Sequence, residues 1–134
     1  MTICGRREDK IKAVARELGP NCRGEAADVS KDADRRRIIA AAVEHGGKLD
    51  ALVNNAAIVR DGFIFKANPA AWDATLRTNL SGAFRLLAAA TPAMREAAKT
   101  RAPGAIINLL STAGFYGNFG QSAYGSAKAG LFGL

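Results

Sequence analysis

The chain has 134 residues, 49% of them hydrophobic and 23% charged, with a formal net charge of +7. These proportions are ordinary for a globular protein and exclude a low-complexity or collagen-like chain. No apolar run reaches the roughly 18 residues that a membrane helix needs, and the N-terminal MTICGRRED lacks the apolar core of a signal peptide. Two cysteines provide neither a metal-binding spacing nor a disulfide framework. We therefore expect a cytoplasmic protein with no metal site and no membrane association.

The densest run of positive charge is Arg35–Arg37. A basic run of this kind can mark a nucleic-acid-binding surface, but no nucleic-acid-binding motif accompanies it. The run falls inside a segment with helical periodicity. We therefore predict a solvated helix face and no nucleic acid partner.

Short strand-like segments alternate with longer helix-like segments along the whole chain. Strands are expected at 1–4, 21–28, 49–58 and 104–111, and helices at 7–19, 31–47, 68–100 and 122–134. The last two strands are apolar on both faces, as in a parallel sheet covered on both sides. This alternation predicts one Rossmann-like, doubly wound α/β domain over residues 1–134. Pro92 is expected to kink or interrupt the long helix.

A tyrosine and a lysine, Tyr124 and Lys128, lie four residues apart on the last predicted helix and therefore share one of its faces. A tyrosine is a poor acid–base catalyst at neutral pH, because its ordinary pKa is about 10. A nearby ammonium favours the phenolate and lowers that value. The pair could thus exchange a proton with a carbonyl or an alcohol. The spacing alone also fits an ordinary pair on a helix surface.

Other polar residues are expected at the same edge of the sheet. Ser111 ends the apolar strand at 104–111, and the asparagines of Asn54–Ala57 follow the strand before it. In open α/β sheets, ligands bind outside the carboxyl ends of the strands. The glycine-rich segment 112–123 could fold the serine back toward Tyr124. Asn79 lies inside a long helical segment, where asparagine is unfavourable and needs a structural reason.

These segments together resemble the short-chain dehydrogenase/reductase family, especially its 3-oxoacyl-(acyl carrier protein) reductase and hydroxyacyl dehydrogenase members. The resemblance is carried by LDALVNNAAI, LRTNLSGAF and NLLSTAGFYGNFGQSAYGSAKAGL, in the order and with the spacing typical of the family. It implies hydride transfer between a nicotinamide cofactor and a small carbonyl or alcohol substrate, for which a 3-oxoacyl thioester is one possibility. It also implies a homo-oligomer at full length.

The resemblance assigns roles to individual residues. In the catalytic group, Tyr124 would be the general acid or base, and Ser111 would hydrogen-bond the substrate oxygen. Lys128 would assist the tyrosine and hold the nicotinamide ribose, and Asn79 would hold a water of the proton relay. In the cofactor group, the expected contacts, besides Tyr124 and Lys128, are Asn55, Ala56 and Ala57 along the cofactor and Asp28 and Val29 at the adenine. Ala57 departs from the glycine usual in the family and adds one methyl group near the cofactor.

The residues after the first strand bear on the choice of nucleotide. In this fold an acidic residue at the end of the second strand binds the ribose hydroxyls of NAD, whereas arginine accommodates the 2′-phosphate of NADP. The strand at 1–4 of this chain corresponds to the second strand of the family, and Arg6 and Arg7 follow it. The planar guanidinium of arginine suits phosphate. We therefore expect NADP(H) rather than NAD(H). The alternative is that both arginines are solvated turn residues.

The glycine-rich Thr-Gly-x-x-x-Gly-x-Gly turn of the family is missing, and so are its later strands. The resemblance therefore implies a fold truncated at both ends, without the central first strand. Its neighbours, the second and fourth strands of the family, correspond to the strands expected at 1–4 and 49–58. They would then pair directly or accept a strand from another chain, or else the fold would be only marginally stable. We expect little activity from this chain alone. The alternative to a partial enzyme is a non-catalytic gene remnant or a dimerising fragment.

Overall fold

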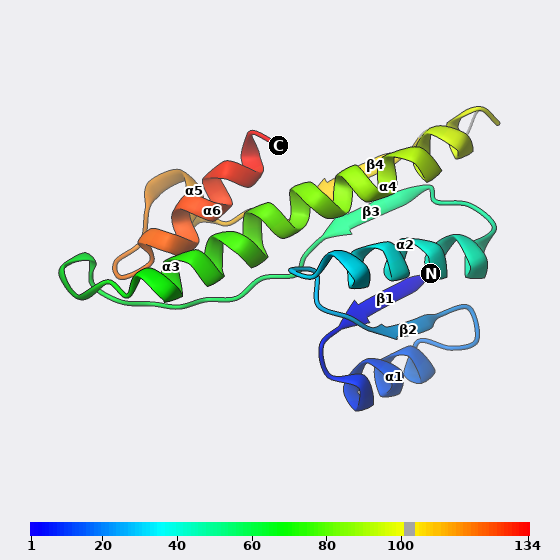
Figure 1. Ribbon diagram of the computed structural model, residues 1–134, viewed down its shortest axis with the longest axis horizontal. Helices are drawn as coiled ribbons and strands as arrows, with labels where there is room; N and C mark the ends of the chain where they lie inside the picture. Colours follow the sequence, from blue (N-terminus) through cyan, green and yellow to red (C-terminus); the bar gives the residue numbers. More distant parts are fainter. Residues whose placement is uncertain (101–103) are drawn as a thin grey trace. The chain divides into compact units, whose positions relative to one another are not determined.

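The computed structural model describes residues 1–100 and 104–134, in which strands and helices alternate (Figure 1). The strands are β1 (Thr2–Gly5), β2 (Arg23–Ala26), β3 (Ala51–Asn54) and β4 (Ala105–Asn108). The α-helices are α1 (Glu8–Glu17), α2 (Asp32–Gly46), α3 (Pro69–Leu76), α4 (Gly82–Ala98), α5 (Thr112–Tyr116) and α6 (Ser122–Phe132). A 3₁₀ turn, η1 (Ile64–Lys66), and a π-helical turn, η2 (Arg77–Ser81), complete the list. The chain divides into two compact units.

The first unit consists of Met1–Leu52 and Arg85–Ile106. In it, β1 and β2 pair in parallel from Thr2 opposite Arg23 to Gly5 opposite Ala26, and α1 connects them. The first half of the chain therefore has the strand–helix–strand arrangement that the sequence predicts. The strand β2 ends at Ala26, two residues earlier than expected, and Asp28 lies in the turn before α2.

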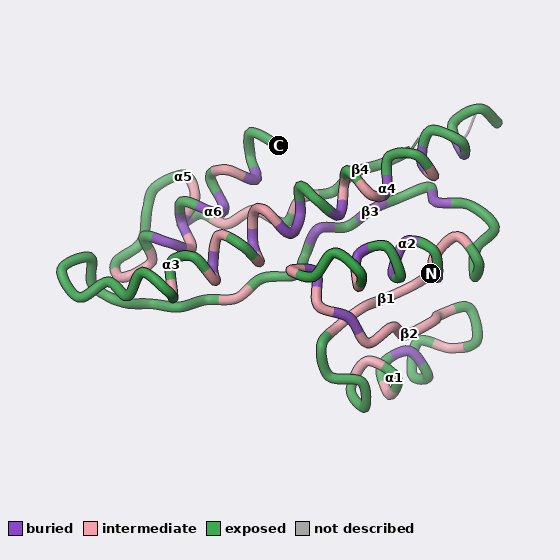
Figure 2. The backbone as a smooth tube through the Cα atoms, viewed as in Figure 1, coloured by how far each residue is buried: buried purple, intermediate pink, exposed green. Residues whose placement is uncertain are grey.

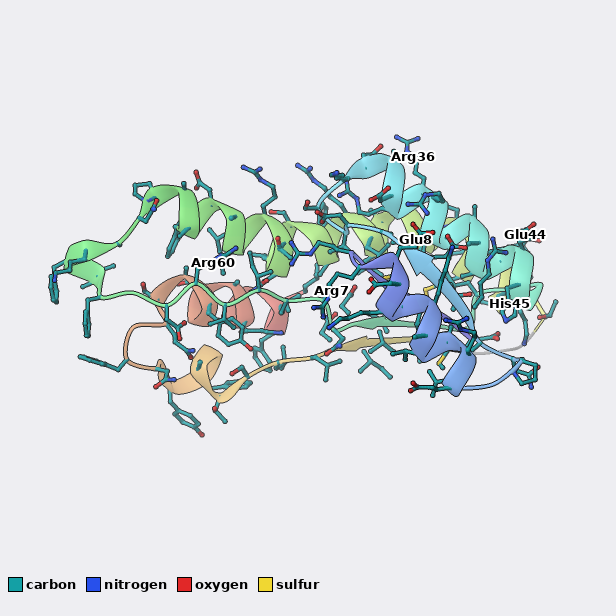
Figure 3. All side chains as sticks on the ribbon, turned by 90° about the horizontal axis from the view of Figure 1, so that it is seen from below. Arg7, Glu8, Arg36, Glu44, His45 and Arg60 are labelled. Carbon is teal, nitrogen blue, oxygen red and sulfur yellow. The ribbon has the colours of Figure 1, made fainter. Side chains whose placement is uncertain are left out.

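The core of the first unit is apolar and draws on the turn after β2, on α2, β3 and α4. It consists of Ala27, Val29, Ile38, Ile39, Leu49, Leu52, Leu86, Ala90 and Met94, and Figure 2 shows these elements alternating between buried and exposed positions. The predicted solvated face at Arg35–Arg37 is only partly correct. Arg36 is exposed and points away from α2 (Figure 3), but Arg35 is only 2% exposed. The prediction was wrong for Arg35 because its guanidinium finds hydrogen-bond acceptors inside the unit.

The four strands form two separate two-stranded sheets, β1–β2 and β3–β4. Bonds from Ala105 N to Asp50 O (2.8 Å) and from Leu109 N to Asn54 O (3.1 Å) keep the same sequence offset, so β3 and β4 are parallel. The strands β1 and β3 are the ones that would flank the missing first strand of the family. They do not pair with each other, so direct pairing, the first of the three expected outcomes, is not observed. Coverage of β3 and β4 on both faces is not observed either: Val53 and Ile107 remain about half exposed, because no described residue covers them fully.

The second unit consists of Val53–Phe84 and Ile107–Leu134. Its helix α3 begins where Asn68 caps the first turn, accepting hydrogen bonds from the amides of Ala70 and Ala71, and Pro69 fits the first helical position. Pro92 does not interrupt α4, which continues through it. Its neighbour one turn back, Ala88, whose carbonyl a proline deprives of its usual helical partner, is exposed. The irregular turn is instead η2, around Asn79.

Candidate active site

The side chain of Asn79 is committed to the backbone of Ile58. Its Oδ1 accepts a hydrogen bond from Ile58 N and its Nδ2 donates to Ile58 O, both at 2.8 Å. Asn79 is 1% exposed and lies in the π-helical turn, in which Gly82 N donates to the carbonyl of Arg77, five residues back. The asparagine therefore holds the segment after β3 by accepting one hydrogen bond from its backbone and donating one to it, as the backbone of a neighbouring strand would. This is the structural reason for an asparagine within a long helical segment.

The structure brings Tyr124 and Lys128 together on α6. The ammonium of Lys128 lies 5.7 Å from the centre of the Tyr124 ring. Lys128 is 3% exposed, and its Nζ donates a hydrogen bond to the carbonyl of Leu109, just after β4. A charged group excluded from water needs such a partner. The lysine thus links the tyrosine-bearing helix to the carboxyl end of β4.

Burial also affects the protonation of this lysine. Because removal from water penalises the charged form, burial lowers the pKa of Lys128 below its ordinary value. The carbonyl of Leu109 can accept a hydrogen bond from either protonation state, so the position of the side chain does not depend on its charge. This arrangement gives α6 a fixed proton-bearing group next to the tyrosine ring.

Ser111 follows Leu109 by two residues and caps α5. Its Oγ accepts a hydrogen bond from the amide of Ala113 at 3.2 Å, so the hydroxyl proton is left to donate to another oxygen. The first part of the glycine-rich segment after it forms the short helix α5, which packs on α6.

Two glycines allow the close packing of α5 on α6. A Cβ atom on Gly114 would lie 2.8 Å from the backbone nitrogen of Ala129, and one on Gly125 would lie 2.7 Å from the carbonyl oxygen of Ala113. Real Cβ atoms do not approach this closely, so both positions require glycine. The glycines therefore fix the helix that Ser111 caps against the helix that carries Tyr124 and Lys128.

Asn54 and Asn108, at the ends of β3 and β4, form a hydrogen-bonded pair that was not among the site residues predicted from the sequence. Asn54 is buried, and its Nδ2 donates to Asn108 Oδ1 at 2.9 Å; Asn108 Nδ2 donates to the carbonyl of Leu131 at 3.4 Å. A signal was present in the sequence, because each apolar strand segment contains an asparagine, at positions 54 and 108. By contrast, the expected cofactor contacts Asn55, Ala56 and Ala57 are exposed and belong to no helix or strand.

The expected adenine and phosphate contacts lie in the first unit. Arg6 and Arg7 follow β1, and Asp28 and Val29 follow β2, its hydrogen-bonded neighbour. Burial by itself would raise the pKa of Asp28, but hydrogen bonds from Ser30 and the positive charge of Arg6 lower it overall. Arg6 therefore lies close enough to act on Asp28. Among residues 1–100 and 104–134, no ion pair involves Arg6 or Arg7.

Within the described ranges, no group of three or more histidine, cysteine, aspartate or glutamate side chains is arranged to hold a metal ion. None of the helices in the part of the chain that the structure describes is both long and apolar enough to cross a bilayer.

Parallel strands alternating with helices define an α/β protein, in which a serine after β4 is followed by a tyrosine–lysine pair on α6. Comparison with known sequences gives the family. The pattern of the short chain dehydrogenase family matches residues 1–134, and the chain belongs to that family.

Several curated relatives are similar over nearly the whole chain. A putative short-chain type dehydrogenase/reductase of Mycobacterium tuberculosis is 36% identical over 126 residues, which is 94% of this chain and 43% of the relative. A 3-oxoacyl-[acyl-carrier-protein] reductase of Staphylococcus epidermidis is 37% identical over 130 residues, 95% of this chain and 52% of the relative. A hydroxyacyl-CoA dehydrogenase of M. tuberculosis is 38% identical, over 94% and 41% respectively. The chain thus spans about half the length of the curated relatives it matches.

The clamp on Ile58 predicts a specific loss of stability. Replacing Asn79 by alanine leaves the N–H and C=O of Ile58 without their partners, so the free energy of unfolding should fall by about 2–4 kcal/mol. The change is measured by urea unfolding. Within the described residues, the exposed Asn21 makes hydrogen bonds only through its backbone carbonyl. Asn21→Ala is the control, expected to change stability by less than about 0.5 kcal/mol. Equal effects of the two substitutions would contradict the clamp.

The burial of Lys128 predicts a pH-dependent stability. Its folded-state pKa is lowered, so between that value and the unfolded value of about 10.4 the unfolded state binds more protons. Stability of the unaltered protein, relative to Lys128→Met, should therefore rise as the pH increases from about 7 toward about 10. Urea unfolding across this range measures the difference, and Lys10→Met, at an exposed position, controls for the loss of one charge. A difference that is constant or falls with pH would rule out the lowered pKa.

Proposed function

We propose that, in the whole protein, this chain supplies the active site of an NADP(H)-dependent oxidoreductase acting on a small carbonyl or alcohol. The observation that carries the proposal is the buried ammonium of Lys128, which lies 5.7 Å from the Tyr124 ring centre and is bonded to the strand end that leads into Ser111. A surface pair of tyrosine and lysine would need no such burial. The proposed fold of the whole protein is a doubly wound parallel sheet.

The proposed proton chemistry uses three side chains. In carbonyl reduction, Tyr124 donates its hydroxyl proton to the substrate oxygen, and in alcohol oxidation the phenolate takes it back. Ser111 donates a hydrogen bond to the same oxygen and stabilises its developing negative charge. Lys128 stabilises the phenolate and holds the ribose hydroxyls of the cofactor. The nicotinamide, when bound, supplies or accepts the hydride.

Asn79 is proposed to serve the proton relay through its backbone. Its side chain is fully used by Ile58, so it cannot also hold a water without losing those bonds. A π-helical turn releases a carbonyl from the regular helical pattern. We therefore assign the relay water to the main chain of this turn, with the side chain fixing its position.

The polar groups of the first unit fit a phosphorylated nucleotide. Arg6 and Arg7 follow the strand beside the turn of Asp28 and Val29, and their guanidinium groups have no ion-pair partner among residues 1–100 and 104–134. An arginine fork suits a phosphate better than a ribose hydroxyl. We propose that these arginines hold the 2′-phosphate of NADP(H), that Asp28 and Val29 border the adenine, and that Asn55, Ala56 and Ala57 line the cofactor.

The proposed substrate class rests on the relatives. Those named for 3-oxoacyl and hydroxyacyl compounds suggest an acyl thioester whose third carbon carries the reacting oxygen. A homo-oligomer is proposed for the whole protein on the same basis. For the 134-residue chain by itself we propose little activity.

The proposed acid–base role is tested by removing one hydroxyl. In the whole protein, Tyr124→Phe should lower the rate of NADPH-dependent carbonyl reduction by about 10²–10⁴-fold, because the proton donor is lost. The decrease in NADPH absorbance measures the rate. The matched control is Tyr116→Phe, at a tyrosine that is 88% exposed, and its rate should stay within about twofold. The role is refuted if Tyr124→Phe retains full activity.

The proposed nucleotide preference is tested by titration. The unaltered protein should bind NADPH more tightly than NADH, with cofactor fluorescence as the signal. Changing Arg6 and Arg7 together to alanine should remove about tenfold or more of NADPH affinity and leave NADH affinity nearly unchanged, because charge-assisted bonds to the 2′-phosphate are lost. Replacement of the exposed Arg60 by alanine is the control for net charge. Equal losses for both nucleotides would show that the arginines do not distinguish them.

A further inference from the structure

The basic run at Arg35–Arg37 does not form a uniform surface, and the proposed chemistry does not use it. Near the start of α2, side chains from positions 34, 35 and 37 bond the backbone of residues 26, 28 and 29. These backbone groups lie at the last residue of β2 and in the turn that joins β2 to α2. The first turns of the helix therefore fasten the turn that leads into it.

The central contact is made by a buried arginine. Arg35 Nη1 donates to the carbonyl of Val29 at 2.7 Å, and Nη2 donates to Asp32 Oδ1 at 3.1 Å. The side chain is 2% exposed, and its Nε has no hydrogen-bond partner among the described residues. Burial of an incompletely paired guanidinium is unfavourable for stability. An apolar residue at this position would fill the core without that cost.

Two partly exposed side chains, Asp34 and Arg37, bond the backbone just before Val29. Asp34 Oδ2 accepts a hydrogen bond from Asp28 N at 2.7 Å. Arg37 Nη2 donates to the carbonyl of Ala26 at 2.6 Å and to Asp34 Oδ1 at 2.9 Å. Among residues 1–100 and 104–134, the intervening Arg36 bonds only Asp32 and no backbone group of the turn. The contacts therefore come from particular positions and not from the positive charge of the run.

The turn is also closed by its own groups. Asp28 Oδ1 accepts from Ser30 N, and Asp28 O accepts from Lys31 N, both at 2.9 Å. Together with the three contacts from α2, these bonds fix the backbone of residues 26–30 and the direction of the Asp28 carboxylate. A turn fixed in advance does not lose conformational entropy when it receives a ligand.

We infer that Arg35, supported by Asp34 and Arg37, is a positioning residue that presets the turn of Asp28 and Val29 to receive the adenine of the cofactor. The inference rests on the proposed function. Arg35 acts through the backbone of Val29 and does not touch the nucleotide, because its guanidinium is buried.

The test compares Arg35→Met with Arg36→Met in the whole protein. Binding of 2′,5′-ADP, which contains the adenine, and of reduced nicotinamide mononucleotide, which lacks it, is measured by calorimetry. Arg35→Met should weaken 2′,5′-ADP by about tenfold, the effect of losing one hydrogen bond from a charged group, and leave the mononucleotide within about twofold. Arg36→Met should change neither. Arg35→Lys, which can donate one bond to Val29, should recover part of the loss.

A second measurement does not involve the cofactor. Amide hydrogen exchange at Ser30 and Lys31 should become faster in Arg35→Met than in Arg36→Met, because the clamp is released. If Arg35→Met does not fold, Arg37→Met, at a side chain 48% exposed, tests the same clamp through Ala26. Unchanged exchange, unchanged 2′,5′-ADP affinity, or equal weakening of both ligands would overturn the inference. An unaltered protein that binds no adenine nucleotide would overturn the proposed function and the inference with it.

Discussion

The buried ammonium of Lys128 is the interaction on which the candidate site depends. A positive charge that is 3% exposed is costly to bury, and the carbonyl of Leu109 is the acceptor that makes it tolerable. Together with the bond from Asn108 to the carbonyl of Leu131, this bond ties α6 to the end of β4, the strand that leads into Ser111. The tyrosine–lysine pair and the serine are therefore related by these contacts as well as by their spacing in the sequence.

The same type of contact occurs after other strands. In each case, a polar side chain from a helical element is buried and bonds a backbone group in the segment that follows a strand. The instances are Lys128 with Leu109 after β4, Asn79 with Ile58 after β3, and Arg35 with Val29 after β2. Loops after strands carry no ladder hydrogen bonds of their own, so a side chain that supplies one fixes the loop without making it regular. Such loops can then present groups to a ligand in a defined geometry.

Most of the secondary structure followed from local patterns. The helical spacing in 7–19 and 31–47 predicted α1 and α2. The strands β3 and β4 lie within the predicted segments 49–58 and 104–111, but each is only four residues long. Other differences came from interactions beyond the local segment. Pro92 lies within the continuous helix α4, one turn after an exposed residue, whereas the irregular turn lies at Asn79, whose side chain bonds Ile58 twice. No helix was predicted at α5, whose Gly114 disfavours helix but is needed there for packing.

The sequence by itself determined the alternation of strands and helices, the family, and the residues Asn79, Ser111, Tyr124 and Lys128 as candidates. These depend on residue type and spacing, which are local or ordered along the chain. Only the tertiary structure decided which polar side chains are buried and what they bond: Lys128 to a carbonyl, Asn79 to a loop, and Arg35 inward while Arg36 remains in water. Neighbours in a basic run look equivalent in a sequence, but helix geometry turns successive side chains by about 100°, so packing alone separates their roles.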